Sequence, residues 1–154
     1  MIEETNGKGN NSSRDEWETP KWLFNQLNEI YHFHFDCCAN EKNKKCNYYS
    51  SDFEKEKYIN LTAWMNPPFS KACKMFEHFF RVVNKGVAIY RCDNIETYLW
   101  QKIIFPNSSW IFVPDKRINY EGSDGNGARF PSALIGIDLP FPELLYGTVL
   151  KKIN

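Results

Sequence analysis

The chain has 154 residues, which is enough for one domain with a sizeable buried core. Its 19 basic and 19 acidic residues balance, so any binding of nucleic acid must rely on a local basic patch and not on a global field. No apolar run is long enough to span a membrane and no secretory signal opens the chain, so we expect a soluble, cytoplasmic protein with no membrane partner.

The cysteines indicate free thiols in a reducing compartment, because they are odd in number and none are paired as C-x-x-C. They are Cys37, Cys38, Cys46, Cys73 and Cys92. A zinc site combining three of them with a histidine would need a spacing that is absent here, so we expect no metal.

Residues 1–13 are polar and rich in Asn, Gly and Ser, which predicts a disordered arm before a single domain over residues 14–154. Thr19 followed by Pro20 predicts the start of a helix, with a hydroxyl N-cap and a proline in the first turn. Capping is a sufficient explanation of this pair. The functional alternative is that the helix N-terminus, with Trp17 nearby, holds a carboxylate and covers a purine.

Strands and helices then alternate along the chain. Strands are expected over 32–36, 61–65, 87–90, 110–113 and 133–137, with a short element at 48–53; helices are expected at 20–30, at 95–104 and from Ser70, as cap, to Gly86. This order predicts an α/β fold with a mostly parallel sheet, whose ligands lie beyond the carboxyl ends of the strands. Asp36, Asp52, Asn66 and Arg91 follow predicted strands and should therefore converge.

The stretch Asn66-Pro67-Pro68-Phe69 follows a short buried strand and offers two oxygen acceptors and one aromatic face. Pro68 disfavours helix at Pro67, which leaves the Pro67 carbonyl available as an acceptor. An amide oxygen and a carbonyl can accept both hydrogens of an amino group on a planar base, while the Phe69 ring stacks on that base. The structural alternative is a stiff turn, since loops rich in Asn and Pro are common.

Four motifs in order carry a family resemblance. They are Asp15-x-Trp17-x-Thr19-Pro20-x-x-Leu23-Phe24, Phe35-Asp36-Cys37-Cys38-Ala39, Asn66-Pro67-Pro68-Phe69 and Arg129-Phe130-Pro131-Ser132-Ala133-Leu134. Together they resemble the phage-type DNA N6-adenine methyltransferases, over residues 15–139. The resemblance implies a single-domain Rossmann-like methyltransferase fold, S-adenosylmethionine as cofactor, double-stranded DNA as partner, and the cytosol of a bacterial, archaeal or phage-infected cell.

The resemblance also implies residue roles in the cofactor site. Thr19 and Pro20, with Trp17, would close over the cofactor, and Asp36 would hold its amino group. Cys37, Cys38 and Ala39 would form the loop beneath it, Asp52 would bind its ribose or adenine, and Asn66 would border both cofactor and target. The sequence departs from the wider methyltransferase pattern in having no G-x-G after the first strand and Phe69 where tyrosine is commoner.

An adenine inside a duplex must be flipped out to reach Asn66. Candidate phosphate contacts are Lys71, Lys74, Arg91, Lys116, Arg117 and Arg129, although each is equally well explained as a solvated surface charge. The polar segment from Asp115 to Arg129 is the candidate reader of DNA sequence.

Two other functions are compatible with these residues. The same acceptors would serve a methyltransferase acting on a cytosine amine, an RNA adenine or a protein glutamine. A catalytically silent nucleic-acid-binding module could also keep the fold.

Overall fold

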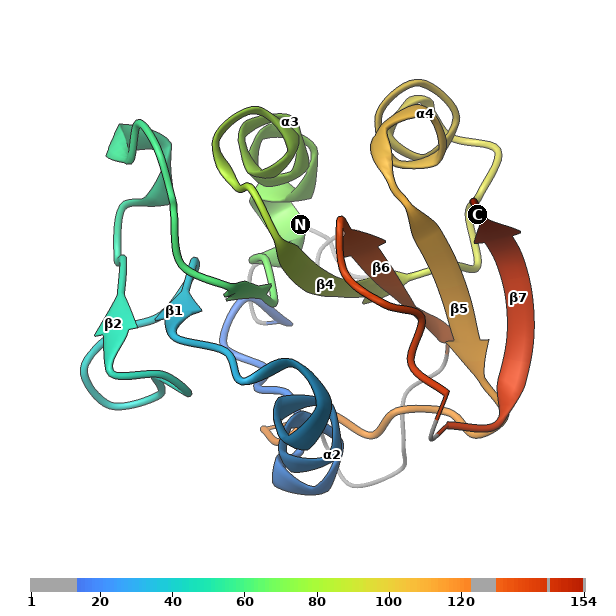
Figure 1. Cartoon of the computed structure of the whole chain (residues 1–154), viewed down its shortest axis with the longest axis horizontal. Helices are drawn as coiled ribbons and strands as arrows, with labels where there is room; N and C mark the ends of the chain where they lie inside the picture. The colour runs from blue at the N-terminus through green and yellow to red at the C-terminus, as the bar shows by residue number, and fades with distance from the viewer. Residues whose placement is uncertain (1–13, 123–129, 144, 154) are drawn as a thin grey trace, which may run out of the picture.

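The computed structural model describes residues 14–122, 130–143 and 145–153, and its described part is built on one seven-stranded sheet (Figure 1). The strand order across the sheet is β2-β1-β3-β4-β6-β5-β7. The strands are β1 (Phe35–Asp36), β2 (Tyr48–Tyr49), β3 (Ala63–Met65), β4 (Gly86–Arg91), β5 (Trp110–Pro114), β6 (Ser132–Ile137) and β7 (Gly147–Lys152). The predicted arm at 1–13 and Arg129 lie outside the described residues.

The sheet has a parallel half and an antiparallel half, so the α/β class is confirmed but the expectation of a mostly parallel sheet is wrong. Strands β2, β1, β3 and β4 pair in parallel. Strand β6 runs antiparallel to β4 and β5, and β7 runs antiparallel to β5. The described part of the connection between β5 and β6, residues 115–122 and 130–131, contains no helix, and β6 lies antiparallel beside β5.

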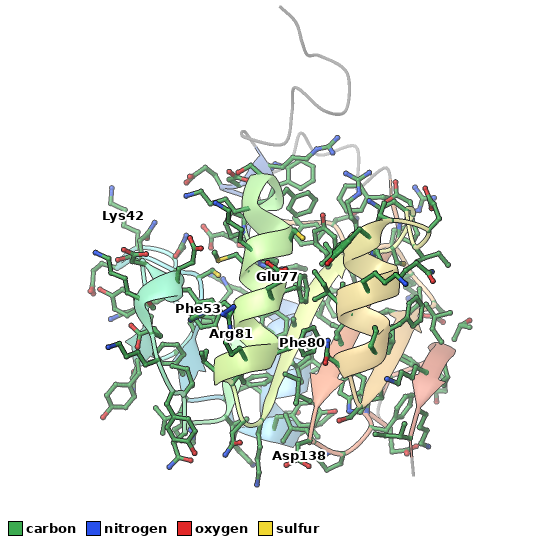
Figure 2. All side chains as sticks on the ribbon, turned by 90° about the horizontal axis from the view of Figure 1, so that it is seen from above. Lys42, Phe53, Glu77, Phe80, Arg81 and Asp138 are labelled. Atoms are coloured by element: carbon green, nitrogen blue, oxygen red, sulfur yellow. The ribbon has the colours of Figure 1, made fainter. Side chains whose placement is uncertain are left out.

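Helices cover both faces of the sheet (Figure 1). Helix α2 (Lys21–Tyr31) lies on one face, and its predicted apolar positions Leu23 and Leu27 are fully buried there with Trp64. The other face carries α3 (Ala72–Val82), the π-helix η3 (Leu99–Ile104) and the short α4 (Phe105–Asn107). In Figure 2, Glu77 and Arg81 lie on the outer surface of α3, whereas Phe80 packs against the core.

Both predicted helix caps are wrong. Helix α2 begins at Lys21, with Pro20 at the N-cap position, and the hydroxyl of Thr19 makes no capping bond. Before α3 the chain forms a 3-10 helix, η2 (Phe69–Lys71), and Ser70 does not cap α3. The backbone N–H of Ser70 instead donates to the Asp15 carboxylate at 2.9 Å, which fastens the amino-terminal segment to this loop.

Other differences concern short or exposed elements. The expected strand at 32–36 is reduced to β1, and the expected element at 48–53 divides into β2 and the 3-10 helix η1 (Phe53–Lys55). Gly86 opens β4 and does not end the preceding helix. Strand β7 was not expected, because its residues are mostly exposed and show no strand-like alternation of burial. Among the described residues, no helix is long and apolar enough to cross a membrane.

Candidate active site

A pocket of about 250 Å³ opens beyond the carboxyl ends of β1 and β3. The predicted residues that line it are Trp17, Thr19, Asp36, Cys38, Ala39, Asp52, Asn66, Pro68 and Lys71. Four further predicted residues, Pro20, Cys37, Pro67 and Phe69, are buried and lie outside this lining. The structure therefore brings together residues that are up to 54 positions apart in the chain, beyond the carboxyl ends of β1 and β3, whereas Arg91, which was expected to converge with them, lies outside this lining.

Asn66 follows directly after β3, and its side-chain amide is oriented by the amino-terminal segment. Its Nδ2 donates to the backbone carbonyl of Trp17 at 3.2 Å. Because the nitrogen faces that carbonyl, Oδ1 remains as an acceptor at the pocket. Among the described residues, no N–H donates to the Pro67 carbonyl. Asn66 therefore presents a free acceptor at the pocket, whereas the Pro67 carbonyl is unbonded among the described residues but belongs to a buried residue outside the pocket lining.

Phe69 lies within a cluster of aromatic rings and is only 6% exposed. Its ring centroid is 5.6 Å from those of Tyr90 and Phe130 and 6.2 Å from those of Trp17 and Tyr120. A base can therefore stack on Phe69 only after a neighbouring ring has moved. The prediction of a stacking role for Phe69 remains a prediction.

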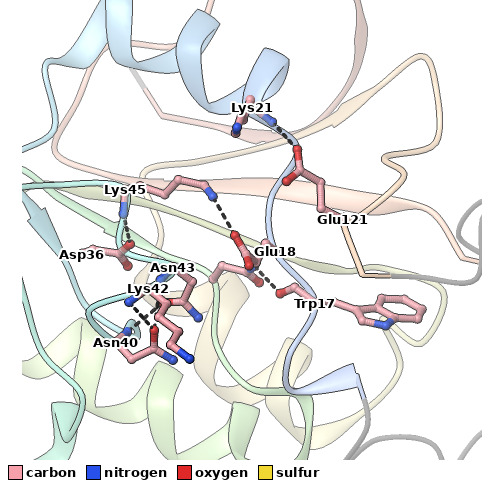
Figure 3. Close-up of polar contacts among 10 residues, drawn as sticks. Trp17, Glu18, Lys21, Asp36, Asn40, Lys42, Asn43, Lys45 and Glu121 are labelled. Atoms are coloured by element: carbon pink, nitrogen blue, oxygen red, sulfur yellow. Dashed lines mark hydrogen bonds and ion pairs between the residues drawn. The ribbon is translucent and has the colours of Figure 1, made fainter.

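The indole of Trp17 belongs to this aromatic cluster. It stacks on Tyr120 at 5.9 Å and on Phe130 at 6.3 Å. Figure 3 shows the ring turned away from Asp36 and Lys45. Trp17 therefore contributes its carbonyl to the orientation of Asn66 and its ring to the wall around Phe69.

Asp36 ends β1 and is 3% exposed. Burial raises the pKa of its carboxyl from 3.8 to about 6, against the smaller opposing effects of the backbone N–H groups of Lys45 and Cys38. The Lys45 N–H donates to Oδ2 at 2.9 Å. A buried carboxylate of this kind gains from a cationic ligand, because an opposite charge offsets its desolvation.

Thr19 offers an unsatisfied hydroxyl to the same pocket. The residue is 1% exposed, and Oγ1 has no hydrogen-bond partner among the described residues. A buried polar group without a partner is unfavourable by about 1–3 kcal/mol, so a ligand that supplies an acceptor is favoured. An amino acid placed here would find a carboxylate for its ammonium and a hydroxyl for its carboxylate. The donor set therefore fits the methionine end of S-adenosylmethionine.

Four charged residues to which the sequence analysis gave no site role also line the pocket: Asp15, Glu18, Lys45 and Glu54. Figure 3 shows Glu18 and Lys45. The Lys45 ammonium lies 3.3 Å from Glu18 Oε1. Glu18 is held by antiparallel backbone bonds to Glu121, each 2.8 Å long. Glu18 could have been predicted as a site residue, because it lies between Trp17 and Thr19 in the sequence. Nothing in the sequence of the loop at 40–47 distinguishes Lys45 from Lys42 and Lys44.

The loop after Ala39 is shaped by Asn40, which lies in the stretch after the first strand where the wider methyltransferase pattern has glycines and this sequence has none. The side-chain oxygen of Asn40 accepts the backbone N–H groups of Lys42 at 2.8 Å and Asn43 at 3.0 Å. Asn43 in turn accepts the N–H of Asn40 at 2.7 Å. This network folds the loop back so that Lys45 reaches the pocket.

A family model described as DNA N-6-adenine-methyltransferase (Dam) matches residues 6–120 of the chain. The chain belongs to this family. The match includes the segment from Asp15 to Thr19, Asp36 and the Asn66 loop, and it ends at Tyr120 beside Phe69. No curated protein matches the chain. Among the described residues, no three His, Cys, Asp or Glu side chains are grouped as metal ligands would be.

The basic residues that were predicted to contact DNA phosphates lie in different environments. Lys71 and Lys74 are exposed, and Lys71 lies at the pocket. Arg91 is bound by both carboxylate oxygens of Asp93, at 2.7 and 2.8 Å, so a phosphate would have to compete with that carboxylate. Lys116 and Arg117 are exposed beside a second, open groove.

Proposed function

We propose that the protein transfers a methyl group from S-adenosylmethionine to the exocyclic amine of adenine in double-stranded DNA. The observation that supports this most strongly is the orientation of Asn66. Its Nδ2 is bonded to the Trp17 carbonyl, so that Oδ1 is left to accept from an amine at a pocket that Asp36 and Thr19 also line. Family membership supports the choice of adenine and DNA.

In the proposed reaction, Asn66 Oδ1 and the Pro67 carbonyl accept the two hydrogens of the adenine amine. These bonds direct the nitrogen lone pair toward the pocket and stabilise the positive charge that develops on nitrogen. Bound S-adenosylmethionine supplies a methyl carbon on a sulfonium, so a nitrogen–carbon bond forms as the carbon–sulfur bond breaks to a neutral thioether. The extra proton then leaves the nitrogen for water, and no general base is required before attack.

The cofactor is proposed to lie along the residues that line the pocket. Asp36 holds its ammonium, and Thr19 donates to its carboxylate. Asp52 lies on the same lining and presents a carboxylate to the ribose hydroxyls. Asp52 is also 3.3 Å from Lys55, in an exposed ion pair that a ligand hydroxyl can share.

The target adenine is proposed to enter from the side of Phe69 after it has left the duplex. Extrusion costs a few kcal/mol, and stacking on an aromatic side chain returns about 1–3 kcal/mol. The rings that cover Phe69 in this structure must separate to admit the base. The segment from Asp115 to Glu121 supplies Tyr120 to this cluster, which supports its proposed role near the target.

The test is methyl transfer by the purified protein from labelled S-adenosylmethionine to duplex DNA, with RNA and protein offered in parallel. Digestion of the product should yield N6-methyladenine. Transfer to cytosine, RNA or protein would support the alternative substrates, and failure to bind the cofactor would support a silent binding module.

Asn66→Ala tests the catalytic assignment within that assay. Loss of one contact directed at the transition state should reduce kcat by about 10²–10³ while cofactor affinity stays near the parent value. Asn25→Ala, on the exposed side of α2, is the matched control and should retain parent activity. Parent turnover by the Asn66 variant would show that the assignment is wrong.

A further inference from the structure

We propose that Lys45 binds the carboxylate of the cofactor's amino-acid end, with Glu18 as the residue that positions its ammonium. The inference rests on the proposed function and deepens it, because it explains how an acidic pocket accepts a ligand that carries a carboxylate. Neither residue belongs to the cofactor set that the sequence motifs indicate.

Lys45 bridges the two carboxylates of this part of the pocket. Its backbone N–H donates to Asp36 Oδ2 at 2.9 Å, and its ammonium reaches Glu18 Oε1 at 3.3 Å (Figure 3). The Lys45 side chain is 14% exposed, whereas in the same loop the Lys44 side chain is 32% exposed and Lys42 is exposed. The course of Lys45 into the pocket therefore indicates a specific role for this lysine.

The Lys45 ammonium has donors to spare. An ammonium has three N–H donors, and Glu18 is its one acceptor among the described residues. The ammonium is half-buried, so its unused N–H groups are only partly hydrated and a second anionic partner is expected to bind it well. The unbonded hydroxyl of Thr19, adjacent to Glu18 in the chain and on the same lining, supplies another donor for that anion.

The charge of the pocket explains why a cation is needed there. Carboxylates dominate the lining, namely Asp15, Glu18, Asp36, Asp52 and Glu54, against Lys45 and Lys71. Such a pocket attracts S-adenosylmethionine, which carries one net positive charge, but it repels the ligand's carboxylate. Lys71 is exposed, so Lys45 is the enclosed cation of the described lining. Asp36 and Lys45 together thus present opposite charges to a zwitterion.

The experiment compares three ligands by titration calorimetry. S-Adenosylhomocysteine carries the whole amino acid, its decarboxylated analogue keeps only the ammonium, and 5′-methylthioadenosine lacks both groups. Lys45→Met should weaken binding of S-adenosylhomocysteine by about 10- to 100-fold, as expected for one charge-assisted contact. Binding of the other two ligands should change by less than about twofold. Lys42→Met, an exposed lysine in the same loop, is the matched control and should resemble the parent protein.

Further variants separate ligand binding from a purely structural ion pair. Lys45→Arg keeps the charge and should retain most of the affinity, and Glu18→Gln should weaken only the ligand that has a carboxylate. Equal losses for all three ligands, or no loss at all, would overturn the inference. If Lys45→Met does not fold, Lys45→Gln and Lys45→Arg provide the same comparison. If the parent protein binds none of the three, the proposed function itself fails, whereas parent binding with no carboxylate selectivity overturns only the role of Lys45.

Discussion

The buried carboxyl of Asp36 makes cofactor binding dependent on pH in a defined direction. Burial raises its pKa to about 6, and only the ionised form can hold an ammonium. At about pH 5, one unit below that pKa, roughly a tenth of the molecules carry the charge. The affinity for S-adenosylhomocysteine should therefore be about tenfold lower at about pH 5 than at about pH 7.5. The ligand's own ammonium and carboxylate do not titrate between these values.

Titration calorimetry across this range, with the parent and Asp36→Asn, measures the effect. The Asn variant should bind more weakly at about pH 7.5 and show little change down to about pH 5. Binding of 5′-methylthioadenosine, which has no ammonium, should be nearly independent of pH in both proteins. If parent affinity for S-adenosylhomocysteine did not fall on acidification, Asp36 would not hold the ammonium.

The same pKa shift of Asp36 predicts that the protein is more stable at lower pH, whereas cofactor binding is predicted to be stronger at higher pH. Because the pKa of Asp36 rises from 3.8 to about 6 on folding, the folded protein holds this proton more tightly than the unfolded chain. The contribution of Asp36 to the free energy of unfolding should therefore fall by about 3 kcal/mol as pH rises through this window. Asp36→Asn should lack this decline in urea unfolding and be more stable than the parent at about pH 7.5. A parent protein as stable as Asp36→Asn, or more stable, at about pH 7.5 would contradict the burial argument.

Three further predictions follow from the surroundings of the site. Phe69→Ala should remove the surface on which the flipped base stacks and raise KM for DNA by about tenfold or more; unchanged kinetics would remove Phe69 from the site. Asp15→Ala should lower the free energy of unfolding by about 1–2 kcal/mol, because the N–H of Ser70 loses its acceptor, and an unchanged urea midpoint would show that the contact contributes nothing. Gly136→Ala should destabilise by about 1–3 kcal/mol or more, since a Cβ there would lie 2.1 Å from the Trp110 ring, and a parent-like thermal midpoint would contradict that packing.

Local sequence patterns were sufficient to predict the buried strands β4, β5 and β6 and the apolar face of α2. The strands expected at 87–90, 110–113 and 133–137 correspond to β4, β5 and β6, and the apolar face of α2 is buried as its spacing predicts. A strand that is buried on both faces is continuously apolar, so it can be recognised from the sequence. Strand β7 has no such signal, because it is held by pairing with β5 while its side chains remain largely exposed.

The direction of the strands could not be predicted from the order of elements. The segment between β5 and β6 was expected to be a polar loop, and that much was correct for its described part. What matters for the site is that the two described ends of this connection place Tyr120 and Phe130 beside Phe69. That placement depends on the packing of rings that are distant in sequence.

By itself, the sequence determined which chemical groups follow the strands: an amide at Asn66, a carboxylate at Asp36 and a hydroxyl at Thr19. Only the tertiary structure decided what each group can do. The Trp17 carbonyl selects the free oxygen of Asn66, burial raises the pKa of Asp36, and Thr19 is left unbonded because Pro20 occupies the cap position. Hydrogen-bond partners and desolvation come from neighbours in space, and these neighbours are contributed by segments that no local pattern connects.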